Sequence, residues 1–306
     1  MSATSATVEV RRRRRAAMTP GAWLGRATVV VVAVFFVLFF AIPVVWLLIA
    51  SGKSPRALLT TGAFSPGSFH DLAANWSALI HFQDGIVFRW LGNSAYYSIA
   101  ALVITLVTTI PAGYALAMGH FRGRKFILTL TLVVMLIPNT ALVLPIFLEL
   151  SAVHLIGKPL AAILPFSFFP FGVYLTYIYF STSVPRDLLD AARIDGCGEL
   201  TVFWRVAMPL ATPVIALVGF FSFVANWNNF FLPFLTVPGK GSPIQVGLTE
   251  LLSNVPAFNP TAAGVTTIQL PTLAVATVLA VLPVLLIFLF SQRFLVAGLT
   301  AGGTKE

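Results

Sequence analysis

Charged side chains are scarce in this sequence. Its 306 residues include 19 Lys and Arg and 10 Asp and Glu, which together make 9% of the chain, whereas a soluble domain carries roughly 25%. Hydrophobic residues make up 58%. A soluble fold of this length needs a charged surface, so the composition excludes a water-soluble enzyme, a nucleic-acid-binding domain and a disordered chain. The remaining class is a polytopic membrane protein, expected to be all-α with kinked helices because it contains 20 prolines.

Residues that carry catalysis or bind metals are also rare. The single cysteine, Cys197, permits no internal disulfide and no cysteine-based metal site. The four histidines are far apart and form no HExxH motif. The string nearest to a phosphate-binding loop ends in Gly52-Lys53-Ser54, but Leu47 stands at its first glycine position, so we expect a turn there. The sequence therefore predicts neither an enzyme nor a metal site.

Long apolar stretches predict the membrane crossings. A helix needs about 20 mostly apolar residues to cross a bilayer. Six stretches meet this requirement, roughly Ala27–Ala50, Asn93–Met118, Phe126–Leu148, Leu160–Phe180, Pro213–Leu235 and Leu270–Phe290. Continuous runs argue against a membrane β-barrel, whose segments are about 10 residues long and alternate. The first stretch is longer than the apolar part of a cleavable signal, about 7–15 residues, and is expected to remain as an anchor.

The distribution of basic residues predicts the orientation. With the N-terminus inside, 14 of the 19 Lys and Arg lie in inner segments, as the positive-inside rule requires. Both termini are therefore expected to be cytoplasmic. Residues 1–26 are expected to form a basic, disordered N-terminus, in which Arg11–Arg15 either determine topology or contact anionic lipid headgroups. Residues 27–306 form the membrane domain, with outer loops at about 51–92 and 236–268 and a cytoplasmic segment at about 185–210.

The cytoplasmic segment 185–210 holds four of the ten acidic residues. Pro185 suits the first turn of a helix. Gly196 and Gly198 would end that helix because glycine accepts positive φ, and a second short helix can begin at Glu199. This elbow exposes apolar and aromatic groups ringed by charge, a surface that is costly to leave in water. Either it packs against the protein's own inner loops or the headgroup layer, or it docks on a separate cytoplasmic subunit and passes that subunit's movement to spans four and five.

A motif in this elbow carries a family resemblance. It reads Asp190-Ala191-Ala192, two residues, Asp195-Gly196, then Phe203 and Pro209-Leu210, and it resembles the EAA loop of ABC-importer permeases. Asp190 stands where that family usually has Glu, and Cys197 where Ala is usual. The resemblance implies a coupling helix that sits in a cleft of the ATP-hydrolysing subunit. The elbow residues so implied are Asp190, Ala191, Ala192, Asp195, Gly196, Leu200, Phe203, Trp204 and Pro209. Phe203 and Trp204 are expected to be the apolar anchors.

Three further stretches are similar to the carbohydrate branch of the same family. They are Tyr114–Ala117 followed by Phe121–Arg124, Trp227–Phe230 with Pro233, and Gln292–Phe294 followed by Gly298–Gly302. Asn229 replaces the acid that is usual in the second of them. Motifs at four places in the same order, over roughly residues 85–304, together resemble the maltose-type sugar permeases. Those transporters have two permease subunits, and this chain resembles the one with the shorter N-terminal region. The resemblance implies a type I ABC importer permease fold in the bacterial cytoplasmic membrane.

The resemblance also implies partners. Two copies of a cytoplasmic ABC ATPase would bind ATP and Mg²⁺, because this chain has no phosphate-binding loop and is expected to hold no cofactor of its own. A second permease subunit, expected to be a different chain, would complete a path through the membrane lipid. An extracytoplasmic solute-binding protein would deliver the solute, with residues 236–268 as a candidate contact. No nucleic acid is expected.

Polar side chains within spans are candidates for the solute path. The candidates are Asn93, Tyr97, Asn226, Trp227, Asn228 and Asn229, and Asn139 with Thr140 follows Pro138 in span three. In one interpretation they hold the bundle together by hydrogen bonds. In the other, amides and aromatic faces line a hydrated path for a neutral polyhydroxyl solute. The predicted function is a permease subunit of an ATP-driven importer for a sugar or oligosaccharide; the alternatives are an importer of an amino acid or peptide, and a membrane scaffold that transports nothing.

Overall fold

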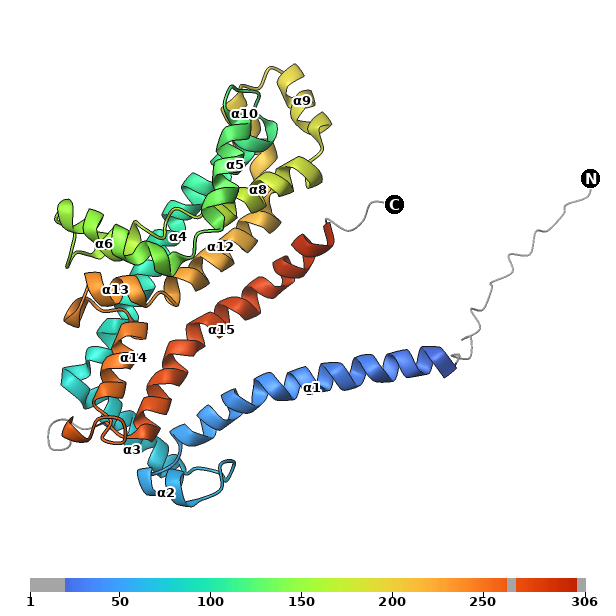
Figure 1. Ribbon diagram of the computed structural model, residues 1–306. Coiled ribbons are helices and arrows are strands. Elements are labelled where there is room, and N and C mark those ends of the chain that lie inside the picture. The colour runs from blue at the N-terminus through green and yellow to red at the C-terminus, as the bar shows by residue number, and fades with distance from the viewer. Residues whose placement is uncertain (1–19, 263–267, 302–306) are drawn as a thin grey trace, which may run out of the picture. The chain divides into compact units, whose positions relative to one another are not determined.

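The computed structural model describes residues 20–262 and 268–301 (Figure 1). Within those residues every regular element is a helix, which confirms the all-α prediction. The chain divides into two compact units, residues 1–47 and residues 48–306. Most of the predicted basic N-terminus, including Arg11–Arg15, lies outside the described residues, and so do residues 263–267 of the predicted outer loop.

The first unit is described from Pro20 onward. It contains most of helix α1, Pro20–Ser51, whose last four residues belong to the second unit. At 1.5 Å per residue, these 32 residues cover about 48 Å, more than the roughly 30 Å of a hydrocarbon core. Phenylalanine rings stack at i,i+4 spacing along α1, Phe35 on Phe39 and Phe36 on Phe40. The first predicted span is therefore one continuous helix.

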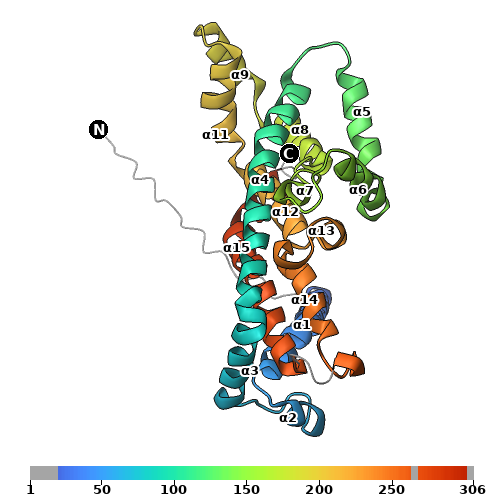
Figure 2. The same ribbon diagram turned by 90° about the vertical axis from the view of Figure 1, so that its left-hand side faces the viewer.

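The second unit contains the remaining helices. In chain order they are α2 (Pro55–Thr60), α3 (Phe69–His81), η1 (Phe82–Gly85), α4 (Ile86–Met118), α5 (Arg124–Met135), η2 (Asn139–Leu142), α6 (Val143–Ala152), α7 (Pro159–Ile163), α8 (Pro170–Ser183), α9 (Arg186–Ile194), α10 (Glu199–Val202), the π-helix η3 (Phe203–Ala207), α11 (Met208–Leu210), α12 (Thr212–Trp227), α13 (Phe231–Thr236), η4 (Gly239–Gly241), α14 (Ile244–Ser253), η5 (Pro260–Ala262) and α15 (Leu270–Ala301). Helix α4 packs along α8 and α12, and α12 packs along α15 (Figures 1 and 2). Both views place α9 at one end of this unit and α2 with α3 at the opposite end.

The described residues contain three helices that are long and apolar enough to cross a membrane, or five crossings if each of two bent helix pairs counts as one. The bent pairs turn by 95° between α5 and η2–α6, and by 78° between α11 and α12. The fourth predicted stretch, residues 160–180, is not one continuous helix. That stretch is divided into α7 and α8 because Pro165 and Pro170 interrupt it. The 14 residues of α8 cover only about 21 Å.

Three helix breaks lie within the second unit. The first, residues 136–138, separates α5 from η2; the second, residues 164–169, separates α7 from α8; the third, residues 228–230, separates α12 from α13. Prolines account for the first two, because proline lacks the N–H that a continuing helix needs. After the third break Pro233 cannot donate to the carbonyl four residues earlier, which favours an interruption there as well. We refer to these three segments together as the break region.

The predicted outer loop 51–92 is largely helical, because α2, α3, η1 and the start of α4 lie within it. Residues 83–85 all have positive φ, which kinks the chain between α3 and α4. Gly52–Ser54 forms the turn predicted for it. Lys53 in that turn is buried, and its Nζ donates to the carbonyl oxygen of Gly62 at 2.7 Å. A buried ammonium satisfied by a backbone carbonyl fixes this loop and is not free to hold a phosphate.

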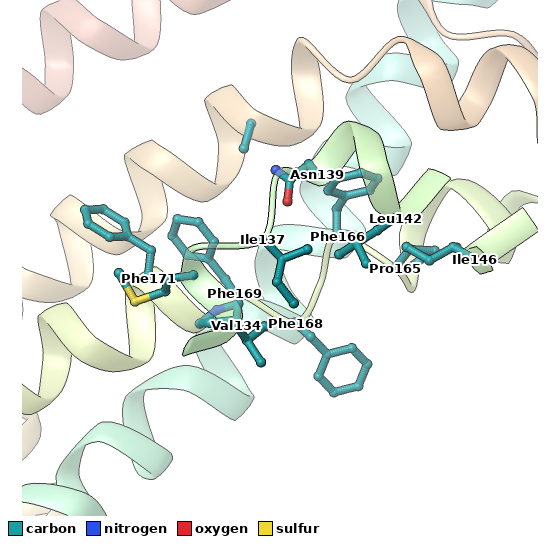
Figure 3. Close-up of a pocket in the computed structure, with 13 residues that line it drawn as sticks. Val134, Ile137, Asn139, Leu142, Ile146, Pro165, Phe166, Phe168, Phe169 and Phe171 are labelled. Atoms are coloured by element: carbon teal, nitrogen blue, oxygen red, sulfur yellow. The ribbon is translucent and has the colours of Figure 1, made fainter. Parts of the chain in front are cut away.

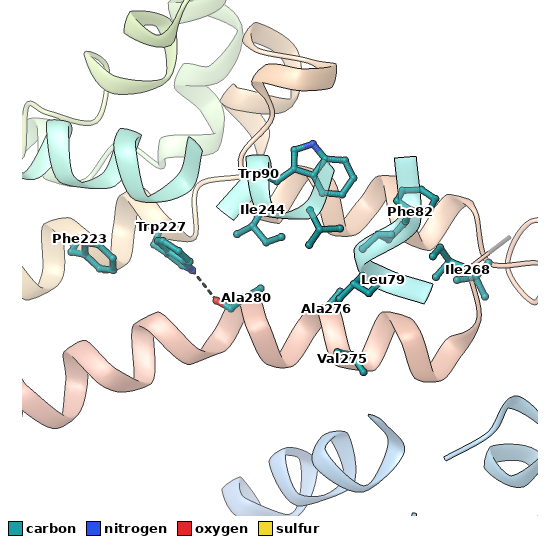
Figure 4. Packing of buried hydrophobic residues seen from close by; sticks show 13 residues of the cluster. Leu79, Phe82, Trp90, Phe223, Trp227, Ile244, Ile268, Val275, Ala276 and Ala280 are labelled. Atoms are coloured by element: carbon teal, nitrogen blue, oxygen red, sulfur yellow. Dashed lines mark hydrogen bonds between the residues drawn. The ribbon is translucent and has the colours of Figure 1, made fainter. Parts of the chain in front are cut away.

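Two tryptophans organise the core where α4, α12, α14 and α15 meet (Figure 4). Trp90 is fully buried, and a Cβ atom at Gly247 would collide with its ring, so glycine is what lets α14 approach α4. The Nε1–H of Trp227 donates to the carbonyl oxygen of Ala280 at 2.9 Å, as Figure 4 shows. This hydrogen bond ties α12 to α15 inside the bundle.

Candidate functional site

The predicted elbow lies at one end of the second unit (Figure 1). Helix α9 begins after Pro185, and Asp187 lies in its first turn, where a carboxylate interacts favourably with the positive end of the helix dipole. Gly196 follows α9 with a φ of +85°, which confirms the predicted glycine turn. The N–H of Cys197 donates to the carbonyl oxygen of Ala192 at 3.0 Å and closes that turn.

Arg193 joins the two helices of the elbow. Its Nη1 donates to Oδ1 of Asp190 at 2.6 Å, and its Nε and Nη2 donate to the two carboxylate oxygens of Glu199 at 2.8 and 3.1 Å. Paired bonds of this kind fix an angle as well as a distance. The hydrogen bonds from Glu199 and then from Asp190 raise the pKa of the Arg193 guanidinium above its usual range. We call this group the Arg193 clasp; it holds α9 bent against α10.

The elbow has a buried face and an exposed face. Val202 is fully buried and Phe203 is 6% exposed, both within one cluster of apolar side chains. Ile194, Leu200 and Trp204 are 86%, 77% and 61% exposed. The expectation that Phe203 is an outward-facing anchor is therefore wrong, because the core of its own chain covers its ring. Of the other predicted elbow residues, Asp190, Ala191, Asp195, Gly196 and Pro209 are exposed and Ala192 is half-buried.

A chain of aromatic rings connects the elbow to the bundle. The ring centroids of Trp204 and Phe203 are 5.1 Å apart, and those of Phe203 and Tyr114 on α4 are 5.0 Å apart. Tyr114 in turn lies 5.2 Å from Phe180 on α8. Trp204 and Phe203 belong to the π-helix η3, a rare geometry that is frequent at functional sites. Trp204 is therefore linked to α4 and α8 by a continuous series of ring contacts.

Two of the predicted path residues on α4 hold a loop. The Nδ2 of Asn93 donates to the carbonyl oxygens of Lys240 and Ser242 at 2.9 and 3.0 Å. The hydroxyl of Tyr97 donates to the carbonyl oxygen of Gly241 at 2.9 Å. These side chains fasten η4 to α4, which is the structural role considered for them above.

Two further path candidates on α12 also make internal hydrogen bonds. Trp227 donates to α15, as described above. The Nδ2 of Asn226 donates to the carbonyl oxygen of Ser222 in its own helix at 2.8 Å. The hydrogen-bonding groups of these two residues are therefore used within the chain.

The last two path candidates, Asn228 and Asn229, line a cavity of about 290 Å³ together with Asn139 and Thr140. A second cavity, of about 490 Å³, shares Asn139 and Phe166 with the first (Figure 3). Phe166 is not among the residues predicted from the sequence, where only the preceding proline marks its position. Neither cavity has an Asp, Glu, Lys or Arg among its described lining residues, and nowhere in the described part of the chain do three His, Cys, Asp or Glu side chains gather as metal ligands would.

Comparison with known proteins gives a family match and several relatives. Residues 109–301 match the family described as the binding-protein-dependent transport system inner membrane component. The chain is 32% identical over 275 residues to the arabinooligosaccharides transport system permease protein AraQ of Halalkalibacterium halodurans, covering 88% of this chain and 93% of that protein. It is 28% identical over 284 residues to the maltodextrin transport system permease protein MdxG of Bacillus subtilis, covering 88% and 94%.

A solved structure shares the fold. It is that of a bacterial ABC transporter involved in the import of the acidic polysaccharide alginate, and one of its chains superposes with a TM-score of 0.76 at 22% sequence identity. The match covers 90% of this chain and 98% of that chain. The two chains therefore share their overall fold.

Proposed function

Because this chain belongs to the family of binding-protein-dependent transport system inner membrane components, we propose that it is the permease subunit of an ATP-driven importer for a neutral oligosaccharide. The family consists of multi-pass membrane transport components and not of enzymes. The observation that carries the coupling part of the proposal is the elbow. The side chains of Ile194, Leu200 and Trp204 are exposed on its surface, while Gly196 and the Arg193 clasp keep its shape.

The elbow suits a cytoplasmic ATPase subunit as its partner. Three large apolar side chains exposed at one end of a membrane protein are costly in water and fit a cleft in another protein. This chain has no phosphate-binding loop, so ATP and Mg²⁺ would be bound by that partner, in two copies, one for this chain and one for a second permease subunit. An extracytoplasmic binding protein would deliver the solute at the opposite end.

The solute class follows from the cavities and the relatives. The relatives named above transport arabinooligosaccharides and maltodextrin according to their names. The cavity walls here offer amides, a hydroxyl and aromatic rings, with no charged side chain among the described lining residues. A neutral polyhydroxyl molecule fits such walls better than an amino acid or a peptide, whose charged ends would need counter-charges.

The mechanism requires an element with two positions that the partner can bias. Closure of the ATPase pair on ATP would pull the elbow as one body, because the Arg193 clasp links α9 to α10. The movement would pass through Phe203 to Tyr114 and Phe180, and so to α4 and α8. These helices would then alternate between inward-facing and outward-facing arrangements.

Purification of the tagged chain with its native partners tests the proposal. The complex should contain an ATPase, and in proteoliposomes it should take up arabinotriose or maltotriose only when ATP and the binding protein are supplied. The double variant Leu200→Ser with Trp204→Ser should co-purify with roughly a tenth as much ATPase subunit as the parent chain, because two exposed apolar anchors are removed.

Phe258→Ser is the matched control. Phe258 is 62% exposed, about as much as Trp204, but lies in the segment between α14 and α15. ATPase content equal in the double variant and in this control would contradict the role of the elbow. Uptake of amino acids or peptides instead of sugars would contradict the solute class, and a complex without an ATPase would favour a scaffold.

A further inference from the structure

The three helix breaks meet at the two cavities. The 490 Å³ cavity is lined by Ile137 from the first break, Asn139 directly after it, and Phe166 and Phe168 from the second break. The 290 Å³ cavity is lined by Asn139, Phe166 and residues 228–230 of the third break. Figure 3 shows Asn139 and Phe166 extending toward this hollow from two separate segments. One hollow region thus touches the interrupted ends of three helices.

Hydrogen bonds place the second break beside the buried middle of α4. The Oγ1 of Thr105 donates to the carbonyl oxygen of Ser167 in the second break at 2.9 Å, and the Oγ of Ser222 donates to Oγ1 of Thr105 at 3.1 Å. Thr105 lies near the middle of the 33-residue helix α4. At such depth irregular backbone is tolerated only when it is buried in protein or lines a watery cavity. Interrupted helices at mid-membrane are also the setting in which carriers bind their solutes.

The polar side chains of this hollow have unused hydrogen-bonding groups. In the described structure the side chains of Asn139, Thr140 and Asn229 make no hydrogen bond within the chain. Asn228 accepts one long bond, 3.4 Å from Nε2 of Gln245. Each amide offers two N–H donors and a carbonyl acceptor, and the hydroxyl offers both. Such groups match the hydroxyls of a sugar, which also donate and accept.

Aromatic rings stand beside these amides. Phe166 and Phe230 both line the 290 Å³ cavity. Phe230 is held by stacking on Phe234, with ring centroids 5.5 Å apart. Mostly apolar walls with a few convergent polar groups are typical of small-molecule sites, which enclose about 300–1,000 Å³. The 490 Å³ cavity lies in the lower part of that range and the 290 Å³ cavity just below it, and the absence of charged side chains from their described linings fits a neutral ligand.

We propose that the break region carries a contact subsite for one neutral sugar ring, midway along the solute path. Its residues are Asn139, Thr140, Asn228 and Asn229, with Phe166 and Phe230 as the apolar walls. The proposal rests on the proposed function and adds that this chain touches the solute itself, so that selectivity is not left to the second permease alone.

Uptake and ATP hydrolysis by the reconstituted complex test the subsite together. At saturating sugar, Asn139→Ala and Asn229→Ala should each lower uptake about tenfold, while stimulation of ATP hydrolysis by the sugar-loaded binding protein is retained. Asn229→Gln, which keeps the amide, should recover most of the loss. Unchanged uptake in both alanine variants would overturn the subsite, and equal loss of uptake and of stimulated hydrolysis would do so too, because it would indicate a structural role.

Thiol labelling tests whether the hollow is wet. In the purified complex, Asn229→Cys should react with the charged reagent MTSET about tenfold faster than Val107→Cys, and a transported oligosaccharide should slow the reaction. Val107 is an exposed apolar residue of α4 two positions from Thr105, so it reports the same depth. The parent chain, with Cys197 alone, gives the background. Equal rates at positions 229 and 107, or no protection by a sugar that the complex transports, would refute the subsite.

The two proposals fail in different ways. A parent complex that takes up no neutral oligosaccharide with its binding protein and ATP would overturn the proposed function, and the subsite with it. Normal uptake by the parent complex and by both alanine variants would remove the subsite and leave the proposed function standing.

Discussion

The elbow and the break region are both places where helices stop, but they are stabilised differently. In the elbow the interruption is contiguous in sequence, turns on a glycine with positive φ and is held by three charged side chains. In the break region the interruptions come from distant segments, and the second of them is held by the uncharged Thr105, Ser167 and Ser222. Exposed charges lose little solvation when they pair, whereas charges at membrane depth lose much. The environment thus decides whether ions or hydroxyls secure a helix break.

The largest effect on uptake is expected from Gly196→Val. A β-branched residue at a φ of +85° is strained by about 1–3 kcal/mol, and no atom lies within 4 Å of a Cβ built at this position, so the strain is purely conformational. The elbow should lose its shape and uptake should fall at least about tenfold, with an unchanged amount of protein in the membrane. Gly196→Asn is the control, because asparagine tolerates positive φ. Equal uptake in the two variants would show that the turn geometry does not matter for coupling.

The largest effect on stability separates the two faces of the elbow. Phe203→Ala should lower the free energy of unfolding by about 3 kcal/mol, since it empties part of the buried cluster around Tyr114. Trp204→Ala should lower it by less than about 1 kcal/mol, since Trp204 lies at the surface. Thermal unfolding of the purified chain in detergent measures both. A larger loss for Trp204→Ala would mean that the assignment of buried and exposed faces is reversed.

A smaller effect is expected in the break region from Thr105→Val. The substitution keeps the shape of the side chain but removes its hydrogen bonds with Ser167 and Ser222, and hydrogen bonds between membrane helices are worth about 0.6 kcal/mol each, rarely above about 1.7. The free energy of unfolding should fall by about 1 kcal/mol. Thr108→Val is the control, because the exposed Thr108 hydroxyl bonds only within α4. An equal loss of unfolding free energy in Thr108→Val would show that the hydroxyls of α4 stabilise the protein through bonds within their own helix and not through the break region.

The contrast between the two regions also explains what the sequence could predict. The elbow lies within 26 consecutive residues, and its proline, glycines and motif are local signals, so the helix after Pro185 and the turn at Gly196 are confirmed. The prediction that the Phe203 side chain points outward is wrong because Tyr114, whose ring packs against it, comes from another helix. Sequence alone cannot tell which of two adjacent aromatics in a π-helix points inward.

The path candidates show the same limit. The carbonyl partners of Asn93 and Tyr97 lie more than 140 residues away, so their internal role depends on the tertiary fold. Asn228 and Asn229 reach a cavity only because a second segment brings Asn139 to them. Long apolar stretches predicted the membrane class and the bundle helices, but not that prolines divide residues 160–180 into α7 and α8.

The smallest effect is expected from the Arg193 clasp. Arg193 and its carboxylate partners are partly exposed, and exposed ion pairs contribute roughly 0.2–1 kcal/mol, less in high salt. Arg193→Gln should therefore lower the free energy of unfolding by a few tenths of a kcal/mol at low salt. In a double-mutant cycle with Glu199→Gln, the coupling energy should shrink as salt rises, whereas the cost of Thr105→Val should not change, because a buried neutral hydrogen bond is not screened. A salt-independent coupling energy would mean that the clasp is secured by its hydrogen-bond geometry and not by charge, and that the two regions differ less than their side chains indicate.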